Sequence, residues 1–465
     1  MAVSSALVLL GITCSACAGD DYERVFYDYL DEQGNLNGGM VYLLTSPDGI
    51  NLPRDSWNWE TLVDNGPTEN RIDYVFVGDG YTAVELGSYN DNVMDALVHL
   101  FGEEPYIRYE PYFNVHRVDV ISNESGVDND PVQGIDRDTA LDMAFWCGGI
   151  ERLLCVNVAK AKNAAACAPD YDVVLAVANS EKYGGAGYIA DDLATFAGGN
   201  DAAPDIAQHE LGHSLGNLTD EYDYGDGSVY DGDEPEFPNV SIYTAAEMAS
   251  MGTKWAAWLG EDNPDFNGLV DTYEGAFYKQ YGIYRPTVTS KMRALGNPFN
   301  LPSVEAIIFE IYRYVDPIDD STPTDATLDG SETVYITPLQ PVGDPLDIQW
   351  YIDGEMIPGA TGDEVDLRLI GLGLGTHELS VKVVDNTTLV RDETQRQNLM
   401  TQQLTWSVEV THVFGDLNGD GCVNQQDLGI LLASYNVDAG GDIDGDGDTD
   451  QADLGILLSV YELVC

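Results

Sequence analysis

Residues 209–221 read HELGHSLGNLTDE, with two histidines four positions apart. On a helix, His209 and His213 are four residues apart and share one face, about 6 Å from each other. Two imidazoles placed in this way can hold one Zn²⁺, and Glu210 beside them can accept a proton from an attacking water. Zinc makes water a nucleophile near neutral pH. The stretch therefore predicts a zinc site on a helix, and the hydrolysis of amide bonds.

Two features around this stretch favour a zinc site over a chance pattern on a solvated helix face. The chain has only six histidines, and two of them are in the motif. Residues 171–178, which read YDVVLAVA, are typical of a buried strand, so we expect the helix to lie behind a core sheet.

The segment after His213 is predicted to supply a third ligand. In an unbroken helix, Asp220 would lie seven residues past His213, roughly 10 Å further along the axis. Gly216 offers a left-handed C-cap, which would end the helix and turn the chain back. Either Asp220 or Glu221 could then bind the metal. Three protein ligands leave one position open, which is typical of a catalytic zinc.

These residues resemble the IgA-peptidase family of metzincin zinc metallopeptidases. The HExxHxxG layout with a later third ligand is typical of metzincins, and the resemblance extends over much of residues 68–315. Further stretches match in the same order, namely 77–81 (VGDGY), 122–126 (SNESG), 179–185 (NSEKYGG) and 284–300 (YRPTVTSKMRALGNPFN). The resemblance implies an endopeptidase in which His209 and His213 are zinc ligands and Glu210 is the general base. Met292 matches the methionine that forms a hydrophobic floor under the zinc.

The family's usual spacing places the third ligand at Thr219, which is a poor ligand for zinc. Similar Asp-Glu-Tyr endings in other secreted metzincin-like peptidases favour Asp220, with Glu221 as the alternative. Tyr222 and Tyr284 flank matched motifs and are candidates for the donor that stabilises the transition-state oxyanion. The upstream histidines, His99 and His116, are interpreted as structural.

The charge and the N-terminus predict an exported protein. With 20 basic and 80 acidic residues the formal charge is −60, which argues against nucleic acid or an anionic membrane as a partner. Residues 1–18 are apolar and end in Ala-Cys-Ala, as a secretory signal peptide does, and no other segment is expected to span a membrane. We therefore expect a secreted or cell-surface-associated protein that acts on protein or peptide substrates.

The cysteines agree with export. After removal of the signal peptide five remain, without zinc-type CxxC spacing, so disulfides are the expected use. We expect a Cys422–Cys465 bond at the end of the chain. The pairing among Cys147, Cys155 and Cys167 stays open.

The end of the chain carries a repeated pattern of acidic residues. Positions 1, 3, 5, 9 and 12 of two EF-hand-like loops are filled by Asp416, Asn418, Asp420, Asn424 and Asp427, and again by Asp442, Asp444, Asp446, Asp450 and Asp453. A glycine at position 6 of each loop allows the sharp bend that calcium ligation needs. Each loop leads into a nearly identical helix, DLGILLASY or DLGILLSVY. The pattern predicts two structural Ca²⁺ ions.

Paired loop-helix repeats of this length resemble type I dockerins over residues 413–465. The resemblance implies a small α-helical calcium-binding domain that would attach the chain to a cohesin-type scaffold partner.

The remaining sequence predicts a multidomain α/β protein. We expect a β-rich N-terminal region at 19–67, the metzincin-like catalytic domain at 68–315, a linker at 316–330 and a domain at 331–412. In that last domain, apolar residues alternate at period two, which is typical of a β-sandwich and looks immunoglobulin-like. The alternating runs are 346–352, 379–383 and 404–410.

Two functions of different classes fit these patterns. The first is a secreted zinc endopeptidase. The alternative is a catalytically inactive, calcium-dependent extracellular binding or adhesion protein. The retention of Glu210, which an inactive site would be free to lose, favours the first.

Overall fold

The structure is a computed structural model, and it describes residues 22–31, 34–44 and 56–463. The predicted signal peptide at 1–18 lies outside these residues, as does Cys465 of the predicted Cys422–Cys465 bond. The chain divides into two compact units. Unit 1 holds the described residues up to Ile107 together with Phe113–Glu310, and unit 2 holds Arg108–Tyr112 and the described residues from Ile311 onward.

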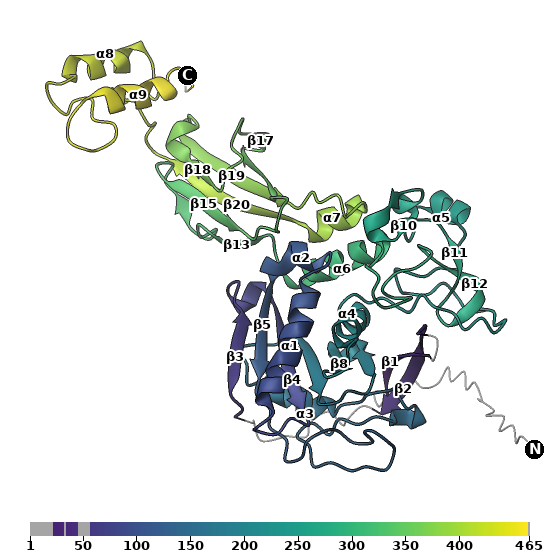
Figure 1. The fold of residues 1–465 in the computed structure, drawn as a ribbon. Coiled ribbons are helices and arrows are strands. Elements are labelled where there is room, and N and C mark those ends of the chain that lie inside the picture. The colour runs from purple at the N-terminus through teal and green to yellow at the C-terminus, as the bar shows by residue number, and fades with distance from the viewer. Residues whose placement is uncertain (1–21, 32–33, 45–55, 464–465) are drawn as a thin grey trace, which may run out of the picture. The chain divides into compact units, whose positions relative to one another are not determined.

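Unit 1 is built on one eight-stranded sheet with the order β2-β1-β7-β8-β6-β4-β5-β3 (Figure 1). The strands β4, β5, β6 and β8 are parallel, whereas β7 runs antiparallel to β8 and β1 runs antiparallel to β7. The bounds are β1 Tyr22–Leu30, β2 Leu36–Leu44, β3 Trp59–Val63, β4 Ile72–Asp79, β5 Phe113–Val118, β6 Val173–Ala178, β7 Gly185–Tyr188 and β8 Leu193–Ala197. The N-terminal region therefore adds strands to both edges of the sheet.

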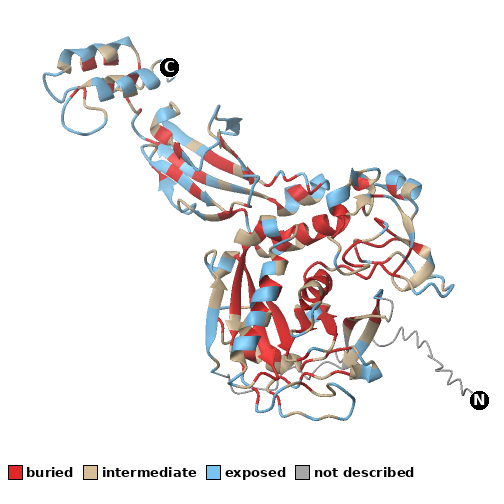
Figure 2. Ribbon diagram, in the orientation of Figure 1, coloured by how far each residue is buried: buried red, intermediate tan, exposed pale blue. Residues whose placement is uncertain are grey.

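Helices cover both faces of this sheet. The helices of the unit are α1 Leu86–Leu100, α3 Val158–Ala165, α4 Ala203–Ser214 and α5 Ala245–Met251. Helix α4 packs against α1, β7 and β8, while α3 packs against β4 and β6 on the other face. The strands β4, β6 and β8 are buried along their whole length, which Figure 2 shows in red, and this confirms the buried strand predicted within 171–178. Parallel strands covered on both faces are expected to be apolar throughout rather than alternating.

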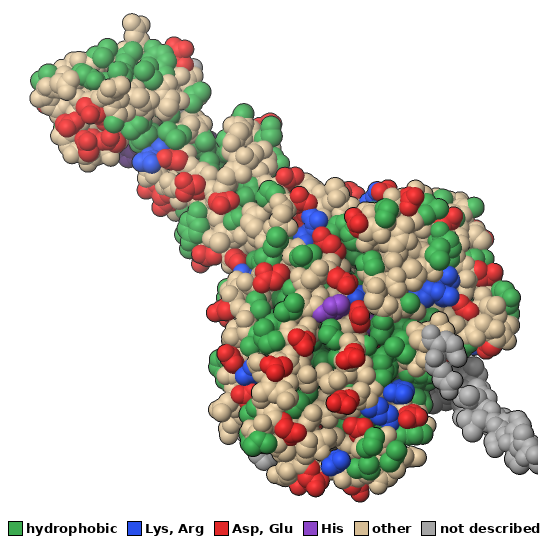
Figure 3. All heavy atoms as spheres, in the orientation of Figure 1, with side chains coloured by type: hydrophobic (Ala, Val, Ile, Leu, Met, Phe, Trp, Pro, Cys, Tyr) green, Lys and Arg blue, Asp and Glu red, His purple; other side chains and the backbone are tan. Residues whose placement is uncertain are grey.

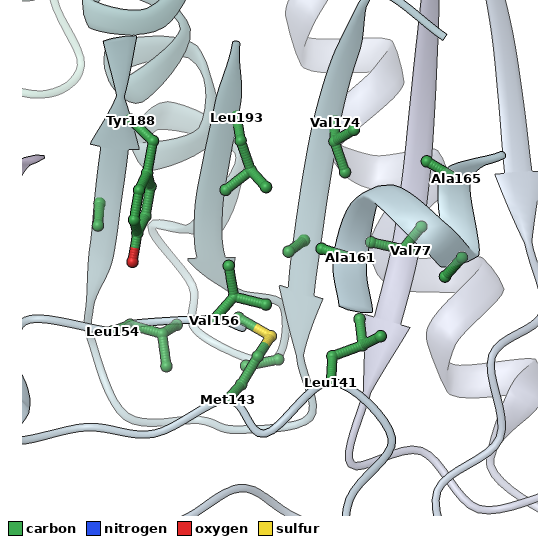
Figure 4. Close-up of a cluster of buried hydrophobic side chains, with 14 of the residues drawn as sticks. Val77, Leu141, Met143, Leu154, Val156, Ala161, Ala165, Val174, Tyr188 and Leu193 are labelled. Atoms are coloured by element: carbon green, nitrogen blue, oxygen red, sulfur yellow. The ribbon is translucent and has the colours of Figure 1, made fainter. Parts of the chain in front are cut away.

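The face opposite α4 is closed by an irregular segment as well as by α3. Leu141, Met143, Leu154 and Val156 from this segment pack against the sheet (Figure 4). Cys147 and Cys155, in the same segment, form a disulfide. Cys167 is not part of that bond and is half-buried.

After α4 the chain of unit 1 is mostly irregular. Its strands are β9 Asp262–Asn263, β10 Gly268–Leu269, β11 Tyr273–Ala276 and β12 Lys279–Arg285. The single-turn helix α2 (Tyr106–Tyr109) and the longer helix α6 (Leu301–Tyr314) each include residues where the chain passes from one unit to the other.

Unit 2 contains two sheets that share one hydrophobic core and together form a β-sandwich. One sheet has the order β13-β15-β18 and the other β14-β20-β19-β16-β17. The bounds are β13 Ile318–Ser321, β14 Thr327–Leu328, β15 Thr333–Pro338, β16 Asp347–Ile352, β17 Glu355–Met356, β18 Glu364–Asp366, β19 Gly375–Val384 and β20 Thr401–Val410, with α7 at Glu393–Leu399. The three alternating runs of the sequence fall in β16, β19 and β20, where their apolar residues face the core around stacked Trp350 and Trp406. Strands β13 and β14 lie within 316–330, the segment predicted as a linker.

Residues 413–463 form two helices, α8 (Gln425–Ser434) and α9 (Gln451–Ser459). Val423, Leu431, Leu457 and Val460 are buried in a core of their own. None of the helices in the described part of the chain has both the length and the apolar character that a bilayer-spanning helix needs.

Candidate metal centre

Helix α4 carries the HELGH motif at the centre of unit 1. Pro204 lies in its first turn, where the missing N–H of proline removes no helical hydrogen bond. The helix is buried from Ile206 to its last residue, because it packs between the sheet and α1. His209 and His213 therefore lie inside the protein and are 1% and 0% exposed.

The two imidazoles are oriented by backbone carbonyls. His209 Nδ1 lies 3.0 Å from the carbonyl oxygen of Lys291, and His213 Nδ1 lies 2.9 Å from that of Leu218. A ring nitrogen that donates to a carbonyl leaves the other nitrogen free to bind a metal. Both Nε2 atoms consequently face the same space.

Asp220 reaches this space from the turn after α4. Its Oδ1 atom lies 3.3 Å from Nε2 of His209 and 3.6 Å from Nε2 of His213. The Tyr278 hydroxyl donates to the other oxygen, Oδ2. Of the two predicted candidates for a third ligand, the structure brings Asp220 to the histidines.

Glu221 points elsewhere. Its carboxylate is buried and accepts hydrogen bonds from Ser290 Oγ (2.6 Å), Asn239 Nδ2 (3.1 Å) and Asn300 Nδ2 (3.0 Å). Its backbone N–H donates to the carbonyl of Met292 at 2.8 Å. These contacts make Glu221 an anchor for the turn.

The turn itself forms differently from the prediction. Gly216 was expected to be left-handed, and this is wrong, because the left-handed residue is Asn217, with φ +48°. The N–H of Leu218 closes the turn onto the carbonyl of Gly212 at 2.9 Å. Gly216 is needed for space instead, since a Cβ there would lie 2.8 Å from the Gly212 oxygen and 3.0 Å from Ile307.

Met292 lies beneath the motif. A Cβ atom on Gly212 would lie 2.7 Å from Met292 Sδ, so the thioether packs against the helix backbone between the two histidines. The side chain is fully buried. This position fits the hydrophobic floor that the resemblance implies.

A fourth residue in the cluster, Asp28 of β1, has no signal in the sequence. Its Oδ2 atom lies 3.0 Å from Nε2 of His209 and 3.6 Å from Nε2 of His213. Its other oxygen, Oδ1, accepts a hydrogen bond from the Tyr222 hydroxyl at 2.7 Å. One ligand atom from each of Asp28, His209, His213 and Asp220 lies within 4.8 Å of the others.

This cluster fits a divalent cation. Burial opposes the charge on His213, but Asp220 and Asp28 outweigh it and raise the pKa of His213 to about 9. Burial likewise opposes the charge on Asp28, yet the two imidazoles hold the pKa of this carboxyl below its usual value. Among the described atoms, His213 Nε2 and Asp220 Oδ1 are buried without a hydrogen-bond partner. Two carboxylates and two imidazole nitrogens that converge in this way form a suitable donor set for zinc.

Glu210 lies beside the cluster and makes no hydrogen bond through its carboxylate to the described residues. It packs against β7, where a Cβ on Gly185 or Gly187 would lie 2.9 Å or 3.1 Å from a Glu210 oxygen. Burial is the main cause that raises the pKa of Glu210 well above its ordinary value, with a contribution from Asp28. A buried carboxylate without partners is free to act on an added water or substrate.

The other predicted residues lie apart from this centre. His99 and Asp205 are 3.2 Å apart in a second acidic cluster, where Lys291 Nζ lies 3.1 Å from both Asp205 and Glu103. The ammonium group lies between the two carboxylates and offsets part of their charge. His116 pairs with Asp73 at 2.9 Å in the sheet.

Tyr222 faces the centre through Asp28, whereas Tyr284 pairs with Ser241 through its backbone and has Glu274 and Glu247 as its charged neighbours. Tyr183, in the NSEKYGG stretch, was not singled out from the sequence. Its buried hydroxyl has no hydrogen-bond partner among the described residues, and Asp28 and Glu210 contribute to raising its pKa after burial.

In the C-terminal loops, the position-12 carboxylates are buried and accept backbone N–H groups. Asp427 accepts from Leu417, Asn418 and Asn424, and Asp453 accepts from Ile443, Asp444 and Asp450. Asp416 and Asp442 each accept from the two glycines of their loops, at positions 4 and 6. The position-6 glycines, Gly421 and Gly447, have positive φ. The two loops therefore have one shared conformation.

Residues 61–267 match the model of a protein family described as IgA Peptidase M64. The matched span contains both histidines, Glu210 and Asp220, and it excludes Asp28. No curated protein matches the chain. The family match, together with the geometry of the centre, supports a metallopeptidase.

Proposed function

We propose that the chain is a secreted zinc endopeptidase that hydrolyses peptide bonds of extracellular proteins. The observation that carries the proposal is the convergence of His209, His213 and Asp220 on one space, with the unpartnered carboxylate of Glu210 beside it. Hydrolysis of an unactivated amide needs both an electrophilic centre and a base. The residues that would hold the electrophilic metal, and the base, lie within one turn of α4 and the segment that follows it.

His209, His213 and Asp220 would hold the metal. When bound, zinc polarises the scissile carbonyl and makes water more acidic. The residues around it keep the ligands in place, since Lys291 and Leu218 accept from the imidazoles and Tyr278 donates to Asp220. Outer partners of this kind tune affinity and geometry.

In the proposed hydrolysis, Glu210 is the general base. Its carboxylate takes a proton from the attacking water, and can pass that proton to the leaving amine. General bases work best when their pKa lies near the operating pH, and burial shifts the pKa of Glu210 in that direction. The glycines of β7 leave room for the carboxylate, since a Cβ on Gly185 or Gly187 would lie 2.9 Å or 3.1 Å from one of its oxygens.

Export is proposed from the apolar residues 1–18 and supported by the Cys147–Cys155 disulfide, since disulfides persist in oxidising compartments. The alternative of an inactive adhesion protein is less well supported, because the base, both histidines and a carboxylate ligand are present together.

For residues 413–465 we propose two structural Ca²⁺ ions and a dockerin-like role in binding a cohesin-type scaffold. The shared loop conformation supports this, as do the buried Asp427 and Asp453 at position 12. In the second loop, the negative charge of Asp446 raises the pKa of Asp448. A bound cation would relieve this repulsion between the two carboxylates.

The peptidase proposal is tested with purified mature protein, a mixed peptide library and the Glu210→Gln variant, with zinc measured in each. We expect one catalytic zinc in both proteins and a loss of turnover of about 10²- to 10⁴-fold in the variant. Measurable wild-type cleavage that is unchanged in Glu210→Gln, or a wild-type chain that binds no zinc, would contradict the proposal.

A further inference from the structure

The strand β1 brings a carboxylate to the metal centre from outside the family-matched region. Asp28 is 181 residues from His209 in the sequence, yet its Oδ2 lies 3.0 Å from the Nε2 of that histidine. The carboxyl is 1% exposed, and the Tyr222 hydroxyl holds its second oxygen. A buried carboxylate turned toward two imidazoles is placed as a ligand.

Asp28 completes the ligand set. A structural zinc site is closed by four protein ligands, whereas a catalytic site has three and keeps one position open. With His209, His213 and Asp220 as three ligands, Asp28 would occupy the fourth coordination position, which a catalytic site leaves open for water or substrate. The side chains of all four residues and of Glu210 are at most 1% exposed, so the centre is closed to substrate.

The hairpin that carries Asp28 lies across the centre. On one side, β1 pairs with β7 through Val25 with Tyr188 and Phe26 with Gly187. On the other side, Arg24 forms an ion pair with Glu236 at 2.6 Å, and Phe26 is buried in a cluster with Phe237. The Phe26 ring also stacks on the His213 ring, with centroids 4.3 Å apart.

Strand β1 also covers the edge of β7, to which an extended peptide substrate could add as a strand. Apart from its pairing with β1, β7 would be the edge of the sheet next to Glu210. Extended peptides bind by adding a strand to such an edge. The hairpin therefore occupies both the edge and the open position at the metal.

We propose that the paired strands β1 and β2 are a built-in inhibitor of the metal centre, with Asp28 as its fourth protein ligand. The inference rests on the proposed zinc peptidase function. In the closed state Asp28 and Phe26 exclude water and substrate, and displacement of the hairpin opens one position on the metal and the edge of β7. A cavity of about 400 Å³ lined by Asn35, Leu36, Tyr222 and Arg293 adjoins the start of β2.

The test uses the full chain loaded with Co²⁺ in place of zinc, because the visible absorption of cobalt reports its ligands directly. Acetohydroxamate, a small chelator that needs an open position, is titrated into the wild type, Asp28→Asn and Asp28→Ala. Asp31→Asn is the matched control, since it removes the same charge from the turn of the same hairpin, where Asp31 accepts from Asn35. Circular dichroism checks that each variant is folded.

We expect both Asp28 variants to bind acetohydroxamate at least about tenfold more tightly than the wild type and the control, because the competing ligand is absent. Their peptide cleavage should rise in parallel. Equal binding by all four proteins would overturn the inhibitory role, and so would loss of cobalt from the Asp28 variants, which would make Asp28 an obligatory ligand. A wild-type chain that takes up no metal would instead overturn the proposed function.

Discussion

At the scale of single residues, Asp220 and Glu221 are neighbours with opposite orientations. Asp220 turns its carboxylate toward the two imidazoles, whereas Glu221 turns toward Asn239, Ser290 and Asn300. Both are fully buried. One of them is therefore available to a metal, and the other holds the turn that positions it.

We expect Asp220→Ala to weaken zinc binding by at least about 100-fold. This is a larger loss than is expected from removing a residue that only hydrogen-bonds to a zinc ligand. Glu221→Gln should leave zinc affinity unchanged but lower the free energy of unfolding by about 1–3 kcal/mol, because its amide nitrogen would face amide donors. Zinc competition titrations and urea unfolding of both variants measure these effects. The reverse pattern would move the ligand role to Glu221.

Asp172 provides a test of stability against pH. Burial is the main cause that raises its pKa to about 6, and it outweighs the hydrogen bond from the backbone N–H of Asp73, which lowers the pKa. In the unfolded chain the pKa is about 3.9, so the folded protein binds the proton more tightly and its stability falls as pH rises from about 4 to about 6.

We therefore expect Asp172→Asn to stabilise the protein at pH 7, by on the order of 1 kcal/mol after allowance for partial exposure, and to have no such effect at pH 4. Thermal unfolding at both pH values is compared with Asp170→Asn, which removes an exposed charge two residues away. An equal gain in both variants would show that only the net charge matters.

At the scale of elements, α4 depends on a glycine in the middle of its motif. Gly212 permits Met292 to lie against the helix, and a Cβ would approach Sδ to 2.7 Å. We expect Gly212→Ala to cost about 1–3 kcal/mol of stability by overpacking and to weaken zinc binding. Gly87→Ala in α1, where nothing lies within 4 Å of the added Cβ, should instead stabilise by up to about 1 kcal/mol.

Urea unfolding measures the stability of the two alanine variants, and zinc titration measures their affinity for the metal. If Gly212→Ala were as stable as Gly87→Ala, the floor beneath the metal would not be tightly packed.

The C-terminal loops make an independent prediction. Calorimetric titration of the calcium-free chain should show two Ca²⁺ sites, and Asp427→Ala or Asp453→Ala should leave one, because each removes the position-12 ligand of one loop. Asp438→Ala, an exposed residue between the two loops, is the control and should keep both sites. Two sites in either ligand variant would refute the loop assignment.

Several elements of both units could be predicted because their signals are local. The apolar run of β6, the alternating runs of β16, β19 and β20, and the two loop-helix repeats are each contained in fewer than about 20 residues. The turn after α4 was predicted to bring a carboxylate back, but its left-handed residue was assigned to Gly216 rather than Asn217. Both residue types adopt positive φ, and the packing of Ile307 against Gly216 cannot be seen in the sequence.

At the scale of the whole molecule, the contribution of Asp28 could not have been predicted. It depends on how β1 adds to the edge of a sheet whose other strands lie far along the chain, and a lone aspartate in a strand carries no motif. The charge of −60, in contrast, follows from composition alone, and Figure 3 shows acidic side chains scattered over the visible face with few basic ones. Such a surface repels phosphate-rich partners, which is the basis of the prediction against nucleic acid.

We propose that α4 and the turn after it form the active centre of a zinc peptidase. The most direct test compares cleavage of a mixed peptide library by Asp28→Asn and by Asp28→Asn/Glu210→Gln at equal zinc content. We predict cleavage by the single variant and a rate of cleavage lower by about 10²-fold or more in the double variant. Equal cleavage by both proteins, or no cleavage by a zinc-loaded single variant, would contradict it.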